Sequence, residues 1–324
     1  MASRTLTPES IKQSLQQQAF AVRQANFPNH IKFFAPGLKH YATADFEQKN
    51  PYAFLPISVT GDACALDCDH CNKKILEPMI PLQPREGLFK MCEKMATKGT
   101  ESVLISGGSK KTGEVPFMKH MKDIRRIKTE LGMRVIMHTG LVTDEAEVAA
   151  IKEAGVDGVA IDIIGSNETI KKVYHLDSTV EDYDHSLALL SKYELSLRPH
   201  IILGLHYGQF LGEYHALDMI AKYPIQSLVV VILVPMSDTK MWGLTPPPTD
   251  EVELFFQKAR LKMPDTYMML GCARPAGDYK KIVDKAAVEA GFNGIAFPAE
   301  GIINHSKSMG LEPQFFENSC SCGT

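Results

Sequence analysis

The chain has 324 residues, of which 44% are hydrophobic, so it can bury a large core within one domain. Lys plus Arg number 35 and Asp plus Glu 38, which gives a formal net charge of -3 and excludes a broad basic surface for nucleic acid. No run of about 18 apolar residues occurs and the amino terminus lacks an apolar signal core, so we expect a cytoplasmic protein with no membrane segment.

Residues 1–50 are expected to form an N-terminal extension. Thr7, followed by Pro8, combines an N-cap residue with proline in the first turn and predicts a helix that runs to about Arg23. Between 26 and 51, prolines and a glycine interrupt any regular pattern, so we assign no element there.

From Phe54 onward, strand-like and helix-like stretches alternate. Glycines stand where several of the helices should end. The expected strands are 54–60, 102–106, 134–138, 158–163, 196–203, 227–234, 267–271 and 294–297. Amphipathic stretches between them predict helices at 85–98, 143–154, 179–193, 249–262 and 279–290.

Several of these strands are apolar on both faces. The stretch Leu-Val-Val-Val-Ile-Leu-Val at 228–234 is typical of a parallel strand buried on both sides. Eight β/α units over residues 51–303 predict an α/β fold, a (β/α)8 barrel of the TIM type, with its chemistry at the carboxyl ends of the strands. An open, doubly wound sheet is the alternative. The helical extension precedes this barrel, and a C-terminal tail, 304–324, is expected to fold over the barrel mouth.

The first expected strand leads into three cysteines, Cys64, Cys68 and Cys71, spaced C-x3-C-x2-C. Three thiolates on one loop suit either zinc or an iron-sulfur cluster. A zinc site needs a fourth ligand, and the nearby His70 is adjacent in sequence to Cys71, a poor arrangement for one tetrahedral ion. A [4Fe-4S] cluster held by three cysteines keeps one iron open for another ligand.

This loop resembles the signature of the radical S-adenosylmethionine (SAM) enzymes. The resemblance implies that Cys64, Cys68 and Cys71 hold a [4Fe-4S] cluster whose open iron chelates the amino and carboxylate groups of SAM. An electron from the cluster then cleaves SAM to methionine and a 5'-deoxyadenosyl radical. The family usually has an aromatic residue before the third cysteine, and His70 holds that place here, which leaves the adenine contact open.

The glycines after the second expected strand, Gly107 and Gly108, resemble the Gly-Gly-Glu motif that binds the SAM amino group in this family. Ser109 replaces the glutamate, so the resemblance carries over backbone contacts only. An ordinary glycine turn before a helix is the alternative, although glycines also let a ligand approach the backbone closely.

Four more residues near strand ends complete the expected SAM site. By resemblance, Asp162 holds the ribose, and Gly204 lies in a region like G-x-I-x-G-x-x-E beside the adenine. Arg198 is a candidate partner of the SAM carboxylate, and a surface ion pair is its equal alternative. His138 is either a site residue or a packed side chain.

The remaining cysteines suggest a second metal site. Cys272 follows the seventh strand, and Cys320 and Cys322 stand in the last five residues, where an exposed C-x-C segment would be prone to oxidation. If the tail folds back, these three cysteines could bind an auxiliary [4Fe-4S] cluster, with Arg274, Ser319 or Ser321 as candidates for its fourth ligand. Cys92 has the apolar helix spacing of a core residue.

The barrel, the segment 235–241 and Arg274 narrow the resemblance to the biotin and lipoyl synthase group. The stretches Gly-Cys-Ala-Arg-Pro-Ala-Gly at 271–277 and Gly-Ile-Ala-Phe-Pro-Ala-Glu at 294–300, together with the terminal C-x-C, most resemble components of two-protein lipoyl synthases. This implies sulfur insertion into an octanoyl chain on a carrier-protein lysine.

The implied partners are an octanoylated lipoyl-domain or H-protein-type carrier, a second radical SAM synthase component and an electron donor, without nucleic acid or membrane. The alternatives are another biotin synthase-like enzyme, such as a maturase or methyltransferase, and a non-catalytic iron-sulfur or zinc module. Iron content discriminates between them, because two [4Fe-4S] clusters need about eight iron atoms per chain and one needs about four. The sequence leaves open whether C6 or C8 receives sulfur.

Overall fold

The computed structural model describes residues 8–37, 40–83 and 85–320. Within them, eleven strands form one sheet in the order β11-β1-β10-β9-β8-β7-β6-β5-β4-β2-β3, and all of its strand pairs are parallel. The strands are β1 (His30–Phe34), β2 (Phe54–Ser58), β3 (Ile80–Pro81), β4 (Ser102–Ser106), β5 (Arg134–His138), β6 (Gly158–Asp162), β7 (Leu197–Leu203), β8 (Ser227–Ile232), β9 (Tyr267–Leu270), β10 (Gly294–Ala296) and β11 (Glu312–Phe316).

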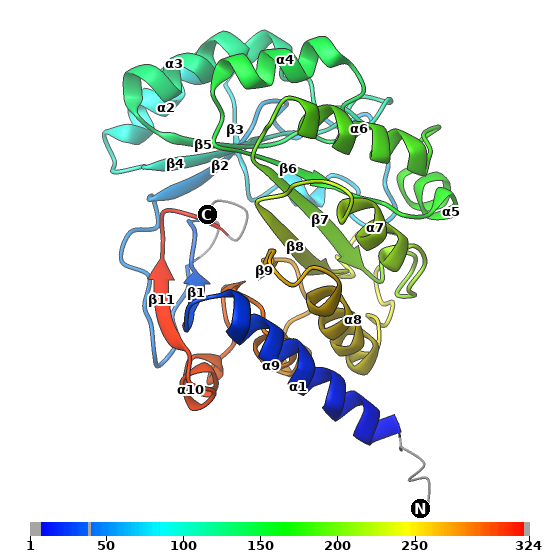
Figure 1. Cartoon of the computed structure of the whole chain (residues 1–324). Helices are drawn as coiled ribbons and strands as arrows, with labels where there is room; N and C mark the ends of the chain where they lie inside the picture. The colour runs from blue at the N-terminus through cyan, green and yellow to red at the C-terminus, as the bar shows by residue number, and fades with distance from the viewer. Residues whose placement is uncertain (1–7, 38–39, 84, 321–324) are drawn as a thin grey trace, which may run out of the picture.

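The sheet is curved, and most helices cover its outer face (Figure 1). Helix α1 packs against α8 and α9. The helices are α1 (Pro8–Asn26), α2 (Leu88–Ala96), α3 (Met121–Leu131), α4 (Glu145–Ala154), α5 (Asn167–Thr169), α6 (Val180–Lys192), α7 (Glu213–Ile220), α8 (Thr249–Lys262), α9 (Asp278–Glu289) and α10 (Ile302–Ser308), with a π-helix η3 (Ile170–Tyr174) and short 3-10 turns at η1 (Lys74–Leu76) and η2 (Met118–His120). Among these residues, no helix is both long and apolar enough to cross a membrane.

The structure confirms the α/β fold of the TIM type and all eight expected strands. It differs from a closed ring, because the sheet is open and has three further strands, β1, β3 and β11. The helices expected from the sequence are present, and α6 begins with the capping box of Thr179 and Asp182.

Strand β1 corrects the expectation of an irregular stretch after the first helix. It lies between β10 and β11, with Phe34 opposite Ala296 on one side and Phe316 on the other. The rings of Phe34 and Phe316 stack with centroids 5.6 Å apart. The segments expected to form an extension and a tail therefore each contribute a strand to the sheet.

The two end regions of the open sheet, β11-β1 and β2-β3, contact each other with an offset. Gly37, just after β1, donates its N–H to the carbonyl of Phe54 at the start of β2 (3.1 Å). Beyond β11, the Glu317 carboxylate accepts the backbone N–H groups of Lys49 (2.8 Å) and Asn50 (2.6 Å), which precede β2. The described part of the tail thus passes the amino end of β2, instead of covering the carboxyl edge where the three cysteines lie.

The inward faces of the strands enclose an apolar group that we call the lumen cluster, on the inner side of the sheet. Cys320 lies in this cluster and is 6% exposed. Cys92, by contrast, is fully buried in α2, as the sequence predicts. The lumen cluster comprises Phe34, Ala35, Tyr41, Phe54, Ile136, Ala160, Val229, Val231, Met269, Ala296, Phe297 and Cys320.

Candidate active site

The loop after β2 carries the three cysteines at the carboxyl edge of the sheet. The sulfur atoms of Cys68 and Cys71 and one ring nitrogen of His70 lie within 4.8 Å of one another. The Cys64 sulfur accepts a hydrogen bond from the N–H of Ser109 (3.3 Å). Hydrogen bonding from Cys68, together with the His70 ring, lowers the pKa of the Cys71 thiol, and the shared proton raises the pKa of Cys68. Cys71 is therefore suited to present a thiolate to a metal centre.

Gly108 is required for this loop to reach the end of β4. A Cβ at position 108 would lie 2.1 Å from the carbonyl oxygen of Ala63 and 2.5 Å from the Cβ of Cys64. Its N–H instead donates to the hydroxyl of Thr60 (2.7 Å). Gly107 and Gly108 thus lie beside the cysteines, and their contact with SAM stays a prediction.

Asp69, between the second and third cysteines, ties the cysteine loop to three other segments. Its buried carboxylate accepts hydrogen bonds from Tyr207 Oη (2.7 Å) and His175 Nε2 (2.7 Å) and pairs with Lys240 Nζ (2.8 Å). Burial opposes its ionisation, but these three partners together hold the pKa of Asp69 below its ordinary value. A carboxylate within a cysteine motif is visible in the sequence, and our sequence analysis overlooked it.

Three polar side chains from neighbouring strands face the lumen above the lumen cluster. They are His138 at the end of β5, Asp162 at the end of β6 and His200 on β7, directly opposite Asp162 in the sheet. Their ligand atoms lie within 4.8 Å of one another. His138 Nε2 is 3.4 Å from Asp162 Oδ1, and these side chains are 27% and 31% exposed. We call this group the lumen triad; it joins two predicted residues with His200, which the sequence analysis missed.

The charges of the lumen triad are strongly coupled. Burial favours the neutral carboxyl, but His138 and then His200 lower the pKa of Asp162 to about 2. The same pairing outweighs burial at His138 and raises its pKa. Burial and the neighbouring His138 lower the pKa of His200 to about 4. At neutral pH, the triad therefore holds an ionised carboxylate beside a neutral imidazole.

Two buried polar atoms next to this triad have no hydrogen-bond partner among the described residues. They are Nδ1 of His70 and Oη of Tyr174, whose rings lie 4.9 Å apart. Burial, and then the charge of Asp162, raise the pKa of Tyr174. An unpaired buried polar atom costs about 1–3 kcal/mol, so each of these atoms requires a partner such as a water molecule or a bound ligand. Tyr174 ends a π-helix, which has no periodic signal in the sequence.

Arg198 lies away from this group. It is the second residue of β7, and its guanidinium donates to the carbonyl of Asp157 (3.3 Å) and the hydroxyl of Ser196 (3.3 Å). At about 3.3 Å per residue, it stands roughly 16 Å below the carboxyl end of its strand. The structure therefore does not bring Arg198 to the cysteine loop, where the expected contact with the SAM carboxylate would be made.

Gly204 directly follows β7 and has a positive φ of 73°, and its N–H donates to Glu213 Oε1 (2.9 Å). A Cβ there would lie 2.7 Å from the ring of Pro247, so the position needs glycine. The second oxygen of Glu213, Oε2, is buried without a partner among the described residues. Burial raises the pKa of Glu213 to about 7.

The second group of cysteines is only partly described. Cys272 is exposed just after β9, whereas Cys320 is buried in the lumen cluster. Ala273, next to Cys272, packs against that same cluster. Ser319 donates its hydroxyl to the carbonyl of Cys320 (3.0 Å). Cys322 and Ser321 lie outside the described residues, so the expected second site stays a prediction.

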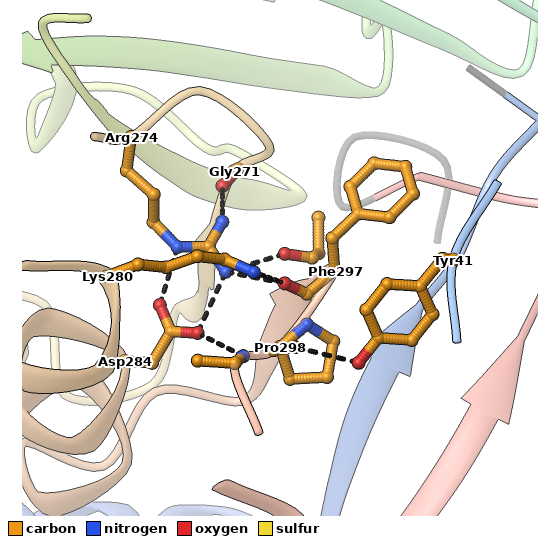
Figure 2. Close-up of polar contacts among 9 residues, drawn as sticks. Tyr41, Gly271, Arg274, Lys280, Asp284, Phe297 and Pro298 are labelled. Atoms are coloured by element: carbon orange, nitrogen blue, oxygen red, sulfur yellow. Dashed lines mark hydrogen bonds and ion pairs between the residues drawn. The ribbon is translucent and has the colours of Figure 1, made fainter. Parts of the chain in front are cut away.

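Arg274 is committed to the framework (Figure 2). Its guanidinium makes two hydrogen bonds to Asp284, Nε to Oδ1 (2.5 Å) and Nη2 to Oδ2 (3.0 Å), and both side chains are fully buried. It also donates to the carbonyls of Gly271 (2.6 Å), Ala296 (2.8 Å) and Phe297 (3.0 Å). We call this network the arginine centre. Each guanidinium nitrogen is already bonded, so Arg274 is not available as a cluster ligand. This corrects the expectation from the sequence.

Comparison with known proteins identifies related families. The family model "Radical SAM superfamily" matches residues 58–212. This range includes the cysteine loop, Gly107, Gly108 and all three residues of the lumen triad. The chain is 25% identical over 260 residues to the biotin synthase of Cenarchaeum symbiosum (strain A), covering 78% of this chain and 76% of that protein. It is 24% identical over 248 residues to biotin synthase 2 of Corynebacterium diphtheriae, covering 74% and 73%.

Solved structures share the fold at lower identity. Methylornithine synthase (PylB) matches with a TM-score of 0.63 and 14% identity, over 95% of this chain and 90% of that one. The FeFe-hydrogenase maturase HydG from Carboxydothermus hydrogenoformans matches with a TM-score of 0.67 and 16% identity, over 95% and 73%. These likenesses concern the arrangement of strands and helices.

Proposed function

Because this chain is a radical SAM enzyme similar to the biotin synthases, we propose that it inserts sulfur into an octanoyl chain carried on a lysine of a carrier protein, as a component of a lipoyl synthase. Its partners would be an octanoylated lipoyl-domain or H-protein-type carrier, a second radical SAM synthase component and an electron donor. The similarity to biotin synthases and the terminal C-x-C support this reading.

The cysteine loop fits a [4Fe-4S] cluster. Cys64, Cys68 and Cys71 offer three thiols on one loop, and the Ser109 N–H already donates to one of the sulfurs. Hydrogen bonds to cluster sulfurs tune the reduction potential of such centres. When bound, the cluster and SAM supply a radical that can take hydrogen from an unactivated C–H bond, a step that side chains alone do not perform.

The surrounding residues would bind and orient SAM. Gly107 and Gly108 offer backbone groups beside the cysteines, and Asp162 offers an ionised carboxylate for the two ribose hydroxyls. The unpaired His70 Nδ1 and Tyr174 Oη are further polar atoms that a bound cofactor can satisfy. Gly204 remains our proposal for the backbone beside the adenine.

The observation that carries the sulfur-insertion proposal is the position of Cys320. A C-terminal thiol lies inside an apolar lumen, an environment that accommodates an alkyl chain. We propose that Cys272, Cys320 and Cys322 hold a second [4Fe-4S] cluster there, as the source of the inserted sulfur. Loss of sulfur from that cluster would limit each molecule to about one turnover until the cluster is rebuilt.

Truncation after Asn318 tests the proposal. The reconstituted chain is incubated without oxygen with SAM, reductant, the second synthase component and an octanoylated carrier. Removal of residues 319–324 should lower the iron content from about eight to about four atoms per chain. It should abolish carrier thiolation and leave 5'-deoxyadenosine formation intact. The Asn318→Ala chain, which keeps residues 319–324 with both terminal cysteines, is the matched control and should thiolate normally.

A truncated chain that keeps its full iron content and still thiolates the carrier would overturn the proposal. One observation favours a rival, a radical SAM enzyme that acts on a polar substrate. The lumen triad places two imidazoles and a carboxylate above the apolar lumen cluster. If the full chain forms 5'-deoxyadenosine but never thiolates any octanoylated carrier, this rival takes its place.

A further inference from the structure

We propose that the lumen triad, His138, Asp162 and His200, binds one divalent transition-metal ion, Zn²⁺ or Fe²⁺, inside the barrel. This site goes beyond the proposed clusters, because its ligands are two imidazoles and one carboxylate. The three residues come from the adjacent strands β5, β6 and β7, so a rigid sheet presents them to one point.

The spacing of the ligand atoms fits a single ion. All three ligand atoms lie within 4.8 Å of one another, and His138 Nε2 is 3.4 Å from Asp162 Oδ1. With metal–ligand bonds of about 2.1 Å and a tetrahedral angle, two ligand atoms of one zinc ion lie about 3.4 Å apart. The observed separation lies at the long end of the range for a hydrogen bond or ion pair and matches the separation across an ion.

His200 is oriented as a ligand by its own strand. Its Nδ1 lies 2.9 Å from the carbonyl oxygen of Arg198. A carbonyl oxygen only accepts, so the proton of this imidazole must be on Nδ1 and the lone pair on Nε2. Metal-bound histidines usually donate their other ring N–H to a carbonyl or carboxylate in this way, which fixes the tautomer. The ring of His138 lies 5.5 Å from that of His200.

Two imidazoles and a carboxylate favour zinc or ferrous iron over magnesium or calcium. Such a set leaves coordination positions open, and here these positions face the lumen, where a substrate would bind. Asp162 has two oxygens, so Oδ1 can bind the ion while Oδ2 accepts a ribose hydroxyl of SAM. One carboxylate can therefore serve the metal and the proposed SAM site together.

Metal binding to the whole chain tests this inference. The chain with reconstituted iron-sulfur clusters is freed of loose metal and titrated with Zn²⁺, and bound zinc is measured after dialysis. We expect one zinc per chain beyond the cluster iron. His200→Gln and His138→Gln should each weaken zinc binding at least about tenfold. The exposed His215 lies outside the triad, and His215→Gln should leave it unchanged.

Cobalt(II) supplies a second readout in the variant with all six proposed cluster cysteines, Cys64, Cys68, Cys71, Cys272, Cys320 and Cys322, replaced by alanine. Visible d–d bands without thiolate charge transfer are expected there, and they should disappear on adding His200→Gln. This variant cannot cleave SAM, so the metal site and the proposed function fail separately. The inference is overturned if the wild-type chain binds no zinc beyond its clusters, or if both triad variants, folded by circular dichroism, bind zinc as tightly as wild type.

Discussion

Two buried polar groups in this molecule differ in how completely their hydrogen bonds are made. In the arginine centre, every nitrogen of Arg274 is bonded, and Asp284 also accepts the N–H of Ala299 (2.7 Å). Beside the lumen triad, His70 Nδ1 and Tyr174 Oη have no partner among the described residues. The guanidinium of Arg274 has no nitrogen left to bind a ligand, whereas His70 Nδ1 and Tyr174 Oη can each form a hydrogen bond with one.

For these two groups, the difference indicates framework in one case and a candidate binding site in the other. Arginine, histidine, tyrosine and aspartate all occur at active sites, so the type of residue does not decide. A buried polar network stabilises a fold only when its members are satisfied, and unsatisfied members cost stability until something binds. Substitutions in the arginine centre should therefore affect unfolding, and substitutions around the lumen triad should affect binding.

The largest effect is expected at the cysteine loop. Replacing Cys64, Cys68 and Cys71 with alanine removes every thiol that the loop offers to the cluster, so 5'-deoxyadenosine formation under reductant should fall to background. The fold should persist, because the framework polar groups lie elsewhere. The product is measured by chromatography, with Cys92→Ala as the control for loss of a cysteine. Unchanged formation in the triple variant would refute the assignment.

Arg274→Met should lower the free energy of unfolding by about 3 to 5 kcal/mol, because it leaves the buried carboxylate of Asp284 without its partner. Denaturant unfolding measures this, and the affinity of the folded variant for SAM should be unchanged. The double variant Arg274→Met, Asp284→Leu should recover part of the loss. A loss below about 1 kcal/mol in the single variant would contradict the assignment of this pair to the framework.

Glu213 is an intermediate case, with one oxygen bonded and one unpaired. Its pKa is raised to about 7 by burial, so the folded state holds the proton more tightly than the unfolded chain. The stability that this carboxyl contributes is present at pH 4 and is lost as the pH rises through 7. In the wild type, the free energy of unfolding should therefore fall by on the order of 2 kcal/mol between pH 5 and pH 8 because of this carboxyl. Glu213→Gln should abolish this fall.

Denaturant midpoints at both pH values measure this effect. The control is Glu181→Gln on the exposed face of α6, which should leave the pH dependence as in the wild type. An identical dependence in the Glu213→Gln chain would show that the carboxyl is ionised without penalty.

Asp162→Asn should weaken SAM binding by about 1 to 3 kcal/mol, because charge-assisted hydrogen bonds to the ribose would become neutral ones. Equilibrium binding of SAM to the reconstituted chain measures this. An affinity equal to that of the wild type would place the ribose contact on another residue.

The smallest effect is expected for Tyr174→Phe, which removes an unpaired hydroxyl. Stability should stay within about 1 kcal/mol of the wild type or rise, because no hydrogen bond is lost. SAM affinity should fall if the hydroxyl completes the cofactor site. A clear loss of stability with unchanged affinity would place Tyr174 in the framework instead.

The central strands of this fold are predictable because burial on both faces leaves long apolar runs, as in β8. Strand β1 was missed because its five residues lie in a proline-interrupted stretch and its pairing with β10 and β11 comes from the tertiary structure. The offset that keeps the sheet open likewise depends on contacts between distant segments, such as Gly37 with Phe54. No local pattern encodes these contacts.

The same distinction holds for the site. Cys64, Cys68 and Cys71 lie on one loop, so their spacing alone brings them together. His200 became part of the lumen triad only because β6 and β7 align it with Asp162. Arg274 shows the opposite error, since its position near Cys272 suggested a ligand, whereas its partner Asp284 lies one helix further on.

The position of β1 has a consequence for the order in which the chain folds during synthesis. Both strands that flank it are made much later than β1 itself, because about 260 residues separate Phe34 from Gly294. At about 5–20 residues per second, the ribosome needs roughly 15 to 50 s to supply the first of these neighbours. Throughout that interval, the apolar side chains of β1 have no sheet to join, and a chaperone that binds nascent hydrophobic segments would find them there.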